Sequence, residues 1–336
     1  MADTASIPII AEPAASASAA RRTRGILMGV GSALTFSLSG PLVKPLLEAG
    51  WSLSAALVLR MGLAGIVLSP ALIRAVLRER GFLRRHWAAL LTFGLVPVAG
   101  CQLFYFAAMQ RMPVAVALLI QFLAPVLLVG FVWARTRRTP SRLVLAGSVV
   151  AIAGLVLVVD VVGARFDPLG ALLALGAAVC VCVYFVMAER TGDQLPPLAL
   201  ASGGLFGGAL VMCALAVTGI LPFHAPDVTV TFRGIEVPGW LPIAVVGVVA
   251  TSLGYALGVM AVPRIGSRLA SFVGLTEVLG ALIYAWLLLG EVPAATQFAG
   301  GAAILLGVIL VRMDAEATAV SAPVEPLPAA DAPGTR

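Results

Sequence analysis

Charged residues are scarce in this sequence. Only 11% of its 336 residues are Asp, Glu, Lys or Arg, whereas 60% are hydrophobic. Soluble domains average roughly 25% charged and roughly 45–50% apolar residues, so water is not the main solvent of this chain. The alternation of polar and apolar residues that marks membrane-spanning strands is missing as well, because segments such as residues 143–159 are apolar throughout. The composition therefore predicts an all-α membrane protein.

Residue types that carry chemistry are also few. The two histidines fall in expected loops, and the four cysteines lie in apolar runs without the spacing of a zinc site: Cys101, Cys180, Cys182 and Cys213. The motifs HExxH, GxxxxGK(S/T) and GxSxG are absent, which leaves ATP-driven pumping and the common hydrolase chemistries unsupported. We therefore expect no cofactor, no metal ion and no enzymatic activity.

Long apolar runs predict ten transmembrane helices, because about 20 helical residues cross the hydrocarbon layer. The predicted spans are residues 25–47, 52–73, 87–109, 114–133, 143–161, 169–188, 198–221, 240–262, 269–289 and 297–311. The longest connector, residues 222–239, is polar and is expected to be a loop. Residues 1–24 and 313–336 lack the apolar content that would order them, and we expect disordered cytoplasmic tails there.

The net charge of +6 is distributed in a way that indicates orientation in a bilayer rather than binding to nucleic acid. With Arg21, Arg22 and Arg24 placed in the cytoplasm, ten crossings return the C-terminus to the same side, together with most of the basic residues. On the outer side fall only Arg111, Arg165 and Arg233. This positive-inside bias predicts that both termini are cytoplasmic.

An internal repeat appears when 153 is added to positions in the first half. The matches are Trp87 with Trp240, Gly94 with Gly247, Arg111 with Arg264, Trp133 with Trp286, Pro140 with Pro293, Gly147 with Gly300, and Gly154 with Gly307. A weaker echo at an offset of 145 pairs Gly25, Gly31 and Ala33 with Gly170, Gly176 and Ala178. Residues 25–161 and 162–312 would then each hold five spans, and an odd number of crossings makes the second half enter the membrane inverted. Inverted repeats are typical of secondary transporters with a substrate site near the midplane.

Three ionisable residues lie within the predicted spans, where charge is costly and usually faces a cavity. Glu277 is the deepest, and an acid at this depth can bind and release a proton, as a proton-coupled carrier requires. A structural partnership with Arg60 or Lys44 is the alternative. Arg60 is expected to hold a substrate carboxylate, or else an ion pair with Glu277 or carbonyls of a broken helix. Lys44 is expected to extend to the interface, with a part in an outer gate as the alternative.

Prolines mark points where spans can break, since each lacks an N–H group. Pro125 frees the carbonyl of Gln121, and the offset places Ala124 and Pro125 on Glu277 and Val278. Pro41 suggests a second break, and an ordinary packing kink is the alternative for both prolines. Further residues that could line a cavity, or only join helices, are Gln102, Tyr105, Tyr184, Ser252 and Tyr255. The pairs Gly203/Gly207 and Gly204/Gly208 allow close helix packing, within one chain or in a homodimer.

The sequence resembles the drug/metabolite transporter superfamily, as a chain with two EamA domains, and is similar to the inner-membrane threonine/homoserine exporters. The resemblance is carried by GPLVKPLLEAG, ALVLRMGLAG, FYFAAMQRMPVAVALLIQFLAPVLL, GALLALGAAVCVCVYFVMAER, GYALGVMAVPRIGSRLASFVGLTEVLGALIYAWLLLGE and GGAAILLGVILV. It implies a ten-span carrier that exports small metabolites such as amino acids. Relatives often carry a glutamate where this chain has Gln121 and a proline where it has Val278, which leaves Glu277 as its mid-span acid.

These observations predict a proton-linked exporter of a small polar or zwitterionic metabolite in the inner or plasma membrane. Its expected partners are the lipid bilayer, a small-molecule substrate and protons, without nucleic acid. Two other classes of function stay open. A membrane-embedded enzyme acting on lipid or prenyl substrates would also be polytopic, but it usually needs clustered Asp, His or Ser. A passive channel is disfavoured by the inverted halves.

Overall fold

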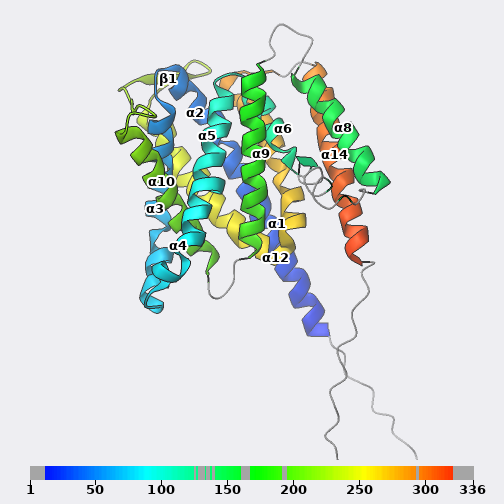
Figure 1. The fold of residues 1–336 in the computed structure, drawn as a ribbon. Helices are drawn as coiled ribbons and strands as arrows, with labels where there is room; N and C mark the ends of the chain where they lie inside the picture. Colours follow the sequence, from blue (N-terminus) through cyan, green and yellow to red (C-terminus); the bar gives the residue numbers. More distant parts are fainter. Residues whose placement is uncertain are drawn as a thin grey trace, which may run out of the picture.

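The structure is a computed structural model that describes residues 12–124, 126–127, 133, 137, 141–159, 167–190, 195–292 and 295–320. These residues form a bundle of mostly helical segments (Figure 1). Apolar side chains cover its outer surface as well as its core, as in a protein whose surroundings are lipid. Six segments of the described chain are long and apolar enough to cross a membrane: Ala20–Glu48, Leu53–Arg78, Phe82–Met109, Pro168–Ala188, Pro197–Val217 and Trp240–Gly266. Shorter apolar helices are Arg142–Gly154, Thr276–Leu289 and Phe298–Gly307.

The first half of the chain contains α1 (Glu12–Ser37), α2 (Ser39–Glu48), α3 (Leu53–Arg78), α4 (Phe82–Phe93), the π-helix η1 (Gly94–Gly100), α5 (Cys101–Met109), α6 (Val114–Gln121) and α8 (Arg142–Val159). The second half contains α9 (Pro168–Glu189), α10 (Pro197–Val217), α11 (Trp240–Val245), the π-helix η2 (Val246–Leu253), α12 (Gly254–Gly274), α13 (Thr276–Tyr284), the π-helix η3 (Ala285–Leu289) and α14 (Ala295–Val320). Within α12 the chain turns sharply at Gly266, whose φ of 76° is open to glycine without strain.

The internal repeat recurs in local structure. Residue 94 begins η1 and its counterpart at the offset of 153 lies in η2, so the same widened turn interrupts both halves. A second interruption follows α6 at Phe122, and its counterpart Leu275 separates α12 from α13. The prolines do not explain the second of these breaks, since Val278 stands where the first half has Pro125. Pro125 itself lies outside the described residues.

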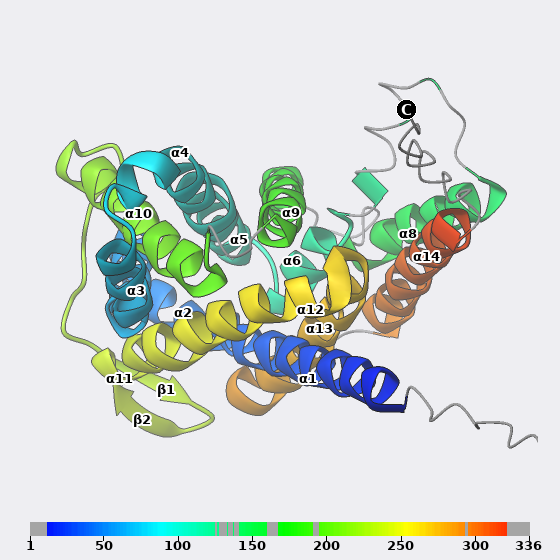
Figure 2. The same ribbon diagram turned by 90° about the horizontal axis from the view of Figure 1, so that it is seen from below.

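Small residues let equivalent helices pack closely. A Cβ atom added to Gly154 of α8 would lie 2.6 Å from the carbonyl oxygen of Gly300 in α14. In return, Gly307 of α14 packs on Gly147 of α8. Residue numbers rise along α8 in the direction in which they fall along α14, so the two helices are antiparallel. They lie side by side in both views (Figures 1 and 2). The contact therefore has the reciprocity of a two-fold axis relating the two halves.

The same principle holds between α3 and α10, where Phe206 packs on Gly65. The glycine pairs of α10 are used within the chain: Gly204 lies against Phe93, and Gly208 lies against the carbonyl oxygen of Gly94. A side chain at either position would separate α10 from the third crossing of the first half.

Two expectations from the sequence need correction. The connector at residues 222–239 is not only a loop, because β1 (Thr229–Phe232) and β2 (Ile235–Pro238) pair in an antiparallel hairpin. Arg233 and Gly234 both have positive φ at its turn, the geometry that matches the twist of paired strands. The described parts of the expected disordered tails are helical, since α1 begins at Glu12 and α14 ends at Val320. The beginning of α1 and the end of α14 project from the same side of the bundle (Figure 1).

Candidate functional site

A cavity lies between the two halves, and its empty space, counted together with the part that is open to solvent, is about 950 Å³. Residues of α1, α2, α3, η1, α5 and α6 form its first-half wall, and residues of α9, α12 and α13 form the rest. The predicted residues that the structure brings together there are Arg60, Gln102, Tyr105, Gln121, Tyr184, Tyr255 and Glu277. These positions are far apart in sequence, so only the packing of the two halves unites them.

Three predicted residues lie elsewhere. Ser252 donates its hydroxyl hydrogen to the carbonyl of Val248 in its own helix, which occupies the side chain locally. Pro41 lies in the first turn of α2, where a missing N–H costs no helical hydrogen bond, and the interruption of the helix is at Leu38. Lys44 forms an ion pair with Glu291, with 19% and 24% of the two side chains exposed. Lys44 is therefore neither a cavity residue nor a free cation at the interface.

Arg60 is the main cation of the cavity and is held from two sides. Its Nε donates a hydrogen bond to Oγ1 of Thr251 at 3.0 Å, and its guanidinium lies 4.8 Å from the centre of the Phe106 ring. Thr251 belongs to η2, and Gly247 in the same π-helix lets α3 approach closely, since an added Cβ would lie 2.7 Å from Leu63. The side chain is only 2% exposed, so packing fixes the direction of the charge.

Glu277 is the acid of the cavity. It is the second residue of α13, so it stands in the first turn of this helix, where the helix dipole favours an anion. Among the described residues, ion pairs join Lys44 to Glu291, Arg85 to Glu79 and Arg111 to Asp167. Arg60 and Glu277 thus share one cavity without forming the fixed ion pair that was the alternative for both.

Three buried oxygen atoms of the lining have no hydrogen-bond partner among the described residues: Ser39 Oγ, Gln102 Oε1 and Gln121 Oε1. The amide nitrogen of Gln102 donates to the Tyr255 hydroxyl at 3.2 Å, and that hydroxyl donates to the carbonyl of Pro97 at 3.4 Å. The amide orientation is thereby set. An unmatched buried acceptor costs about 1–3 kcal/mol, so these oxygens suit a ligand that brings N–H or O–H donors.

Aromatic rings form another part of the lining. The ring centres of Phe36 and Tyr255 are 5.0 Å apart, those of Tyr184 and Tyr255 are 6.2 Å apart, and those of Tyr184 and Phe185 are 5.3 Å apart. Edge-to-face contacts of this kind hold rings at fixed angles.

Sequence reasoning missed several members of the lining, including Ser32, Phe36, Cys101, Phe122 and Phe185. Ser39 stands beside the proline-marked break and could have been found from that signal. Phe36 and Phe185 have no such signal in the sequence, because an aromatic residue in an apolar run faces lipid as readily as it faces a cavity.

Known proteins share this architecture. Residues 23–160 and 168–313 each match the sequence model of the EamA-like transporter family. A solved crystal structure aligns over 90% of this chain and 99% of its own, with a TM-score of 0.55 at 20% identity, which supports the fold alone.

The chain is also similar to several bacterial transporters. An uncharacterized inner membrane transporter of Salmonella typhimurium, YicL, is 25% identical over 71% of this chain and 77% of its own. The transporter YwfM of Bacillus subtilis is 25% identical over 73% of this chain and 81% of its own. The threonine/homoserine exporter RhtA of Salmonella typhimurium is 26% identical over 67% of this chain and 70% of its own.

Proposed function

Because the chain belongs to the EamA-like transporter family, we propose that it is a secondary active carrier that exports a small zwitterionic metabolite in exchange for protons. The protein is a membrane transporter with many apolar helices. An amino acid or an analogue is the proposed substrate, a choice supported by the similarity to a named threonine/homoserine exporter. The observation that carries the proposal is that Arg60 and Glu277 line one cavity and, among the described residues, belong to no ion pair.

A zwitterion would satisfy both charges at once. The planar guanidinium of Arg60 suits a carboxylate, which it can bind through two parallel hydrogen bonds. The ammonium group would bind to ionised Glu277 and to the unpartnered oxygens of Ser39, Gln102 and Gln121. A proton and the ammonium group would then compete for the same carboxylate. Binding of one would favour release of the other, which is the linkage that exchange requires.

The proposed frame is ten spans in two inverted halves, residues 25–161 and 162–312, with both termini in the cytoplasm of an inner or plasma membrane. The antiparallel contact of α8 with α14 supports it, because inverted halves place equivalent helices in opposite directions. The positive-inside bias of the sequence supports the orientation. The proposal places the substrate site within one chain, among the residues that line the cavity.

The test is proton movement in liposomes that contain the purified protein and a pH-sensitive dye. Threonine and homoserine are the first substrates to try, followed by an amino-acid panel. Adding substrate to one side should shift the luminal pH, and Glu277→Gln should abolish the shift. Glu236→Gln is the matched control, since Glu236 lies exposed in the hairpin away from the cavity, and it should behave as the original protein.

Proton movement that persists in Glu277→Gln would remove Glu277 from coupling. A chemically altered product in place of a moved substrate would favour the membrane enzyme, and conductance far above carrier turnover would favour a channel.

A further inference from the structure

The cavity lies inside the bundle, between its two ends. Gly29, Ala261 and Val262 line it, and they lie about one helical turn from Gly25 and Arg264 at one end. Toward the other end, the lining stops at Ser39 in α2 and Tyr105 in α5. We call the end of the bundle beyond Ser39 the Lys44 end, and we call the end that carries Gly25 and Arg264 the Arg264 end.

At the Lys44 end, α2 packs tightly against its neighbours. A Cβ atom added to Gly40 would lie 2.6 Å from Val114 and 3.0 Å from the sulfur of Met109, so α2 contacts both α5 and α6. Val43 and Leu46 of α2 are fully buried one turn further on. A substrate could leave the cavity in this direction only if α2 moved away from these helices.

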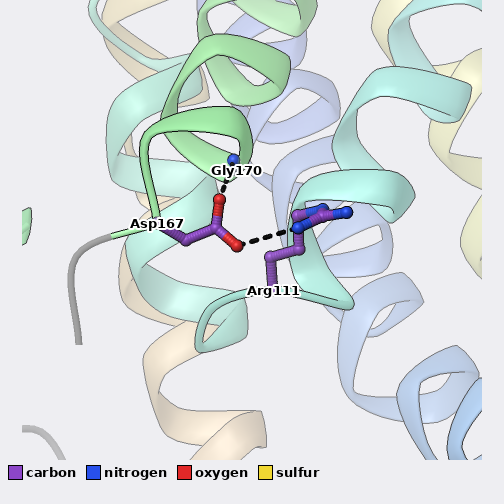
Figure 3. Close-up of polar contacts among 3 residues, drawn as sticks. All are labelled: Arg111, Asp167 and Gly170. Atoms are coloured by element: carbon purple, nitrogen blue, oxygen red, sulfur yellow. Dashed lines mark hydrogen bonds and ion pairs between the residues drawn. The ribbon is translucent and has the colours of Figure 1, made fainter.

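Two ion pairs join the halves at this same end. Arg111, between α5 and α6, places its Nη1 3.0 Å from Oδ2 of Asp167 (Figure 3). The other oxygen of Asp167 accepts a hydrogen bond of 2.8 Å from the amide of Gly170 and caps α9. The second pair joins Lys44 of α2 to Glu291, just after η3. Each pair has one member in each half.

The pKa of the Asp167 carboxyl lies below its ordinary value, first because of the Gly170 amide and then because of Arg111. A lowered pKa means that the contact is fully formed above the ordinary value and is lost only as the pH falls through the lowered one. The Arg111 contact is therefore expected to persist throughout the neutral range.

The repeat shows what stands at the equivalent place of the Arg264 end. Gly170 packs on Arg111, and its counterpart Gly25 packs on Arg264, the counterpart of Arg111. At the offset of 145 that relates Gly25 to Gly170, the counterpart of Asp167 is Arg22. Two cations thus replace a cation and an acid, and Arg264 instead donates to the carbonyl of Met260 in its own helix. Like charges repel, so this end lacks the corresponding attraction.

We propose that Arg111–Asp167 and Lys44–Glu291 form a gate that holds the Lys44 end shut, and that the Arg22/Arg264 pair keeps the Arg264 end ungated. The unloaded carrier would rest with its cavity open toward the Arg264 end, which is the cytoplasmic end in the orientation proposed above. The inference rests on the proposed carrier function only for its role in transport. The asymmetry in charge belongs to the molecule whatever the substrate is.

Side-specific labelling tests the gate without any substrate. The reporter is Ser39→Cys in a chain whose four native cysteines are replaced by alanine, reconstituted in liposomes of known orientation. A membrane-impermeant maleimide should label it faster from the Arg264 end. Combining Asp167→Asn with Glu291→Gln should raise labelling from the Lys44 end by about two- to fivefold for each pair lost, the effect expected of partly exposed ion pairs.

Two further variants separate gating from damage to the fold. Exchanging the charges of one pair, Lys44→Glu with Glu291→Lys, re-forms that ion pair in the opposite sense. The exchanged variant should be labelled as the starting protein is, whereas an unfolded protein would not be. Arg22→Asp should create a counterpart of the Arg111–Asp167 contact and slow labelling from the Arg264 end about two- to fivefold. Arg21→Asp, which makes the same charge change at the neighbouring exposed position, should have a smaller effect.

Equal labelling from both ends in the starting protein, or no response to the double variant, would overturn the gate. Failure of Glu277→Gln to alter proton movement would overturn the coupling proposal but leave these labelling results unaffected. Conversely, if the protein exports substrate but its labelling does not respond to charge changes in the two ion pairs, the carrier function stands and the gate is excluded.

Discussion

At the scale of single residues, the cavity depends on a cation that the fold keeps buried. Burying a charge is expensive unless other groups replace its water. Around Arg60, Thr251 and Phe106 replace part of this water, the first by a hydrogen bond and the second by the face of its ring. Within the described part of the chain, the other guanidinium nitrogens of Arg60 have no hydrogen-bond partner and can meet a ligand. The neighbours of Arg60 should therefore matter for substrate affinity as well as for folding.

Arg60→Lys keeps the charge but loses both the planar stacking and the Nε donor. We expect the KM for substrate to rise about tenfold, because the substrate would lose one hydrogen bond to a charged group. Thr251→Val, which removes only the acceptor that orients the side chain, should raise KM by a smaller factor. Uptake kinetics in liposomes measure both, with Arg84→Lys as an exposed control. An unchanged KM in Arg60→Lys would mean that the substrate does not bind to Arg60.

At the scale of helices, interruptions and small residues determine how the bundle packs. The π-helices η1 and η2 occur at equivalent places, and η2 supplies Thr251 to the cavity. The break at Leu275 makes Glu277 part of a helix start. Neither feature requires a proline at the break in the second half. Helix packing is held by glycine, most clearly where α8 contacts α14.

Gly154→Ala should destabilise the protein, because its new methyl group would lie 2.6 Å from a backbone oxygen of α14 that cannot rotate away. Overpacking of this kind costs about 1–3 kcal/mol. Gly62→Ala in α3 is the matched control, since a Cβ there meets nothing within 4 Å, and it should leave stability unchanged or slightly raised. Thermal unfolding in detergent measures the difference. Equal melting temperatures for the two variants would contradict the close α8–α14 contact.

At the scale of the whole molecule, the repeat predicts a distribution of tryptophan. Trp87 and its counterpart Trp240 are each 62% exposed, and the counterparts Trp133 and Trp286 are 45% and 49% exposed. In inverted halves, the members of each pair lie at opposite membrane surfaces. Each surface would then carry one tryptophan from each pair, as in the aromatic belts at membrane interfaces.

The same frame predicts which segments face the same side. Tags on the N-terminus and on the C-terminus should both be accessible from the cytoplasm, and a cysteine introduced at Glu236 in the hairpin should be labelled only from outside. Side-specific labelling of intact cells and of inverted vesicles measures this. Termini on opposite faces would exclude the inverted arrangement, because an odd total of crossings cannot pair two equivalent halves.

Much of the candidate site could be read from the sequence because membrane segments make polar residues conspicuous. Arg60, Gln121 and Glu277 stand out in apolar runs, where charge or an amide needs a reason. Lys44 was harder, since its partner Glu291 lies just beyond a predicted span and gave no signal of its own. The hairpin was missed because a polar connector with isolated Val and Ile residues resembles a loop until its strands pair.

The sequence by itself determined the solvent of this protein, its helical class and its division into two related halves, because composition and periodicity are local properties of the chain. Only the tertiary structure decided which charges meet. It separated Lys44 from the cavity and joined the halves through Arg111 and Asp167 at one end. Among the described residues, it left Arg60 and Glu277 in the cavity without an ion pair. Electrostatic attraction depends on distance through space, and that distance is fixed by packing between segments far apart in the chain.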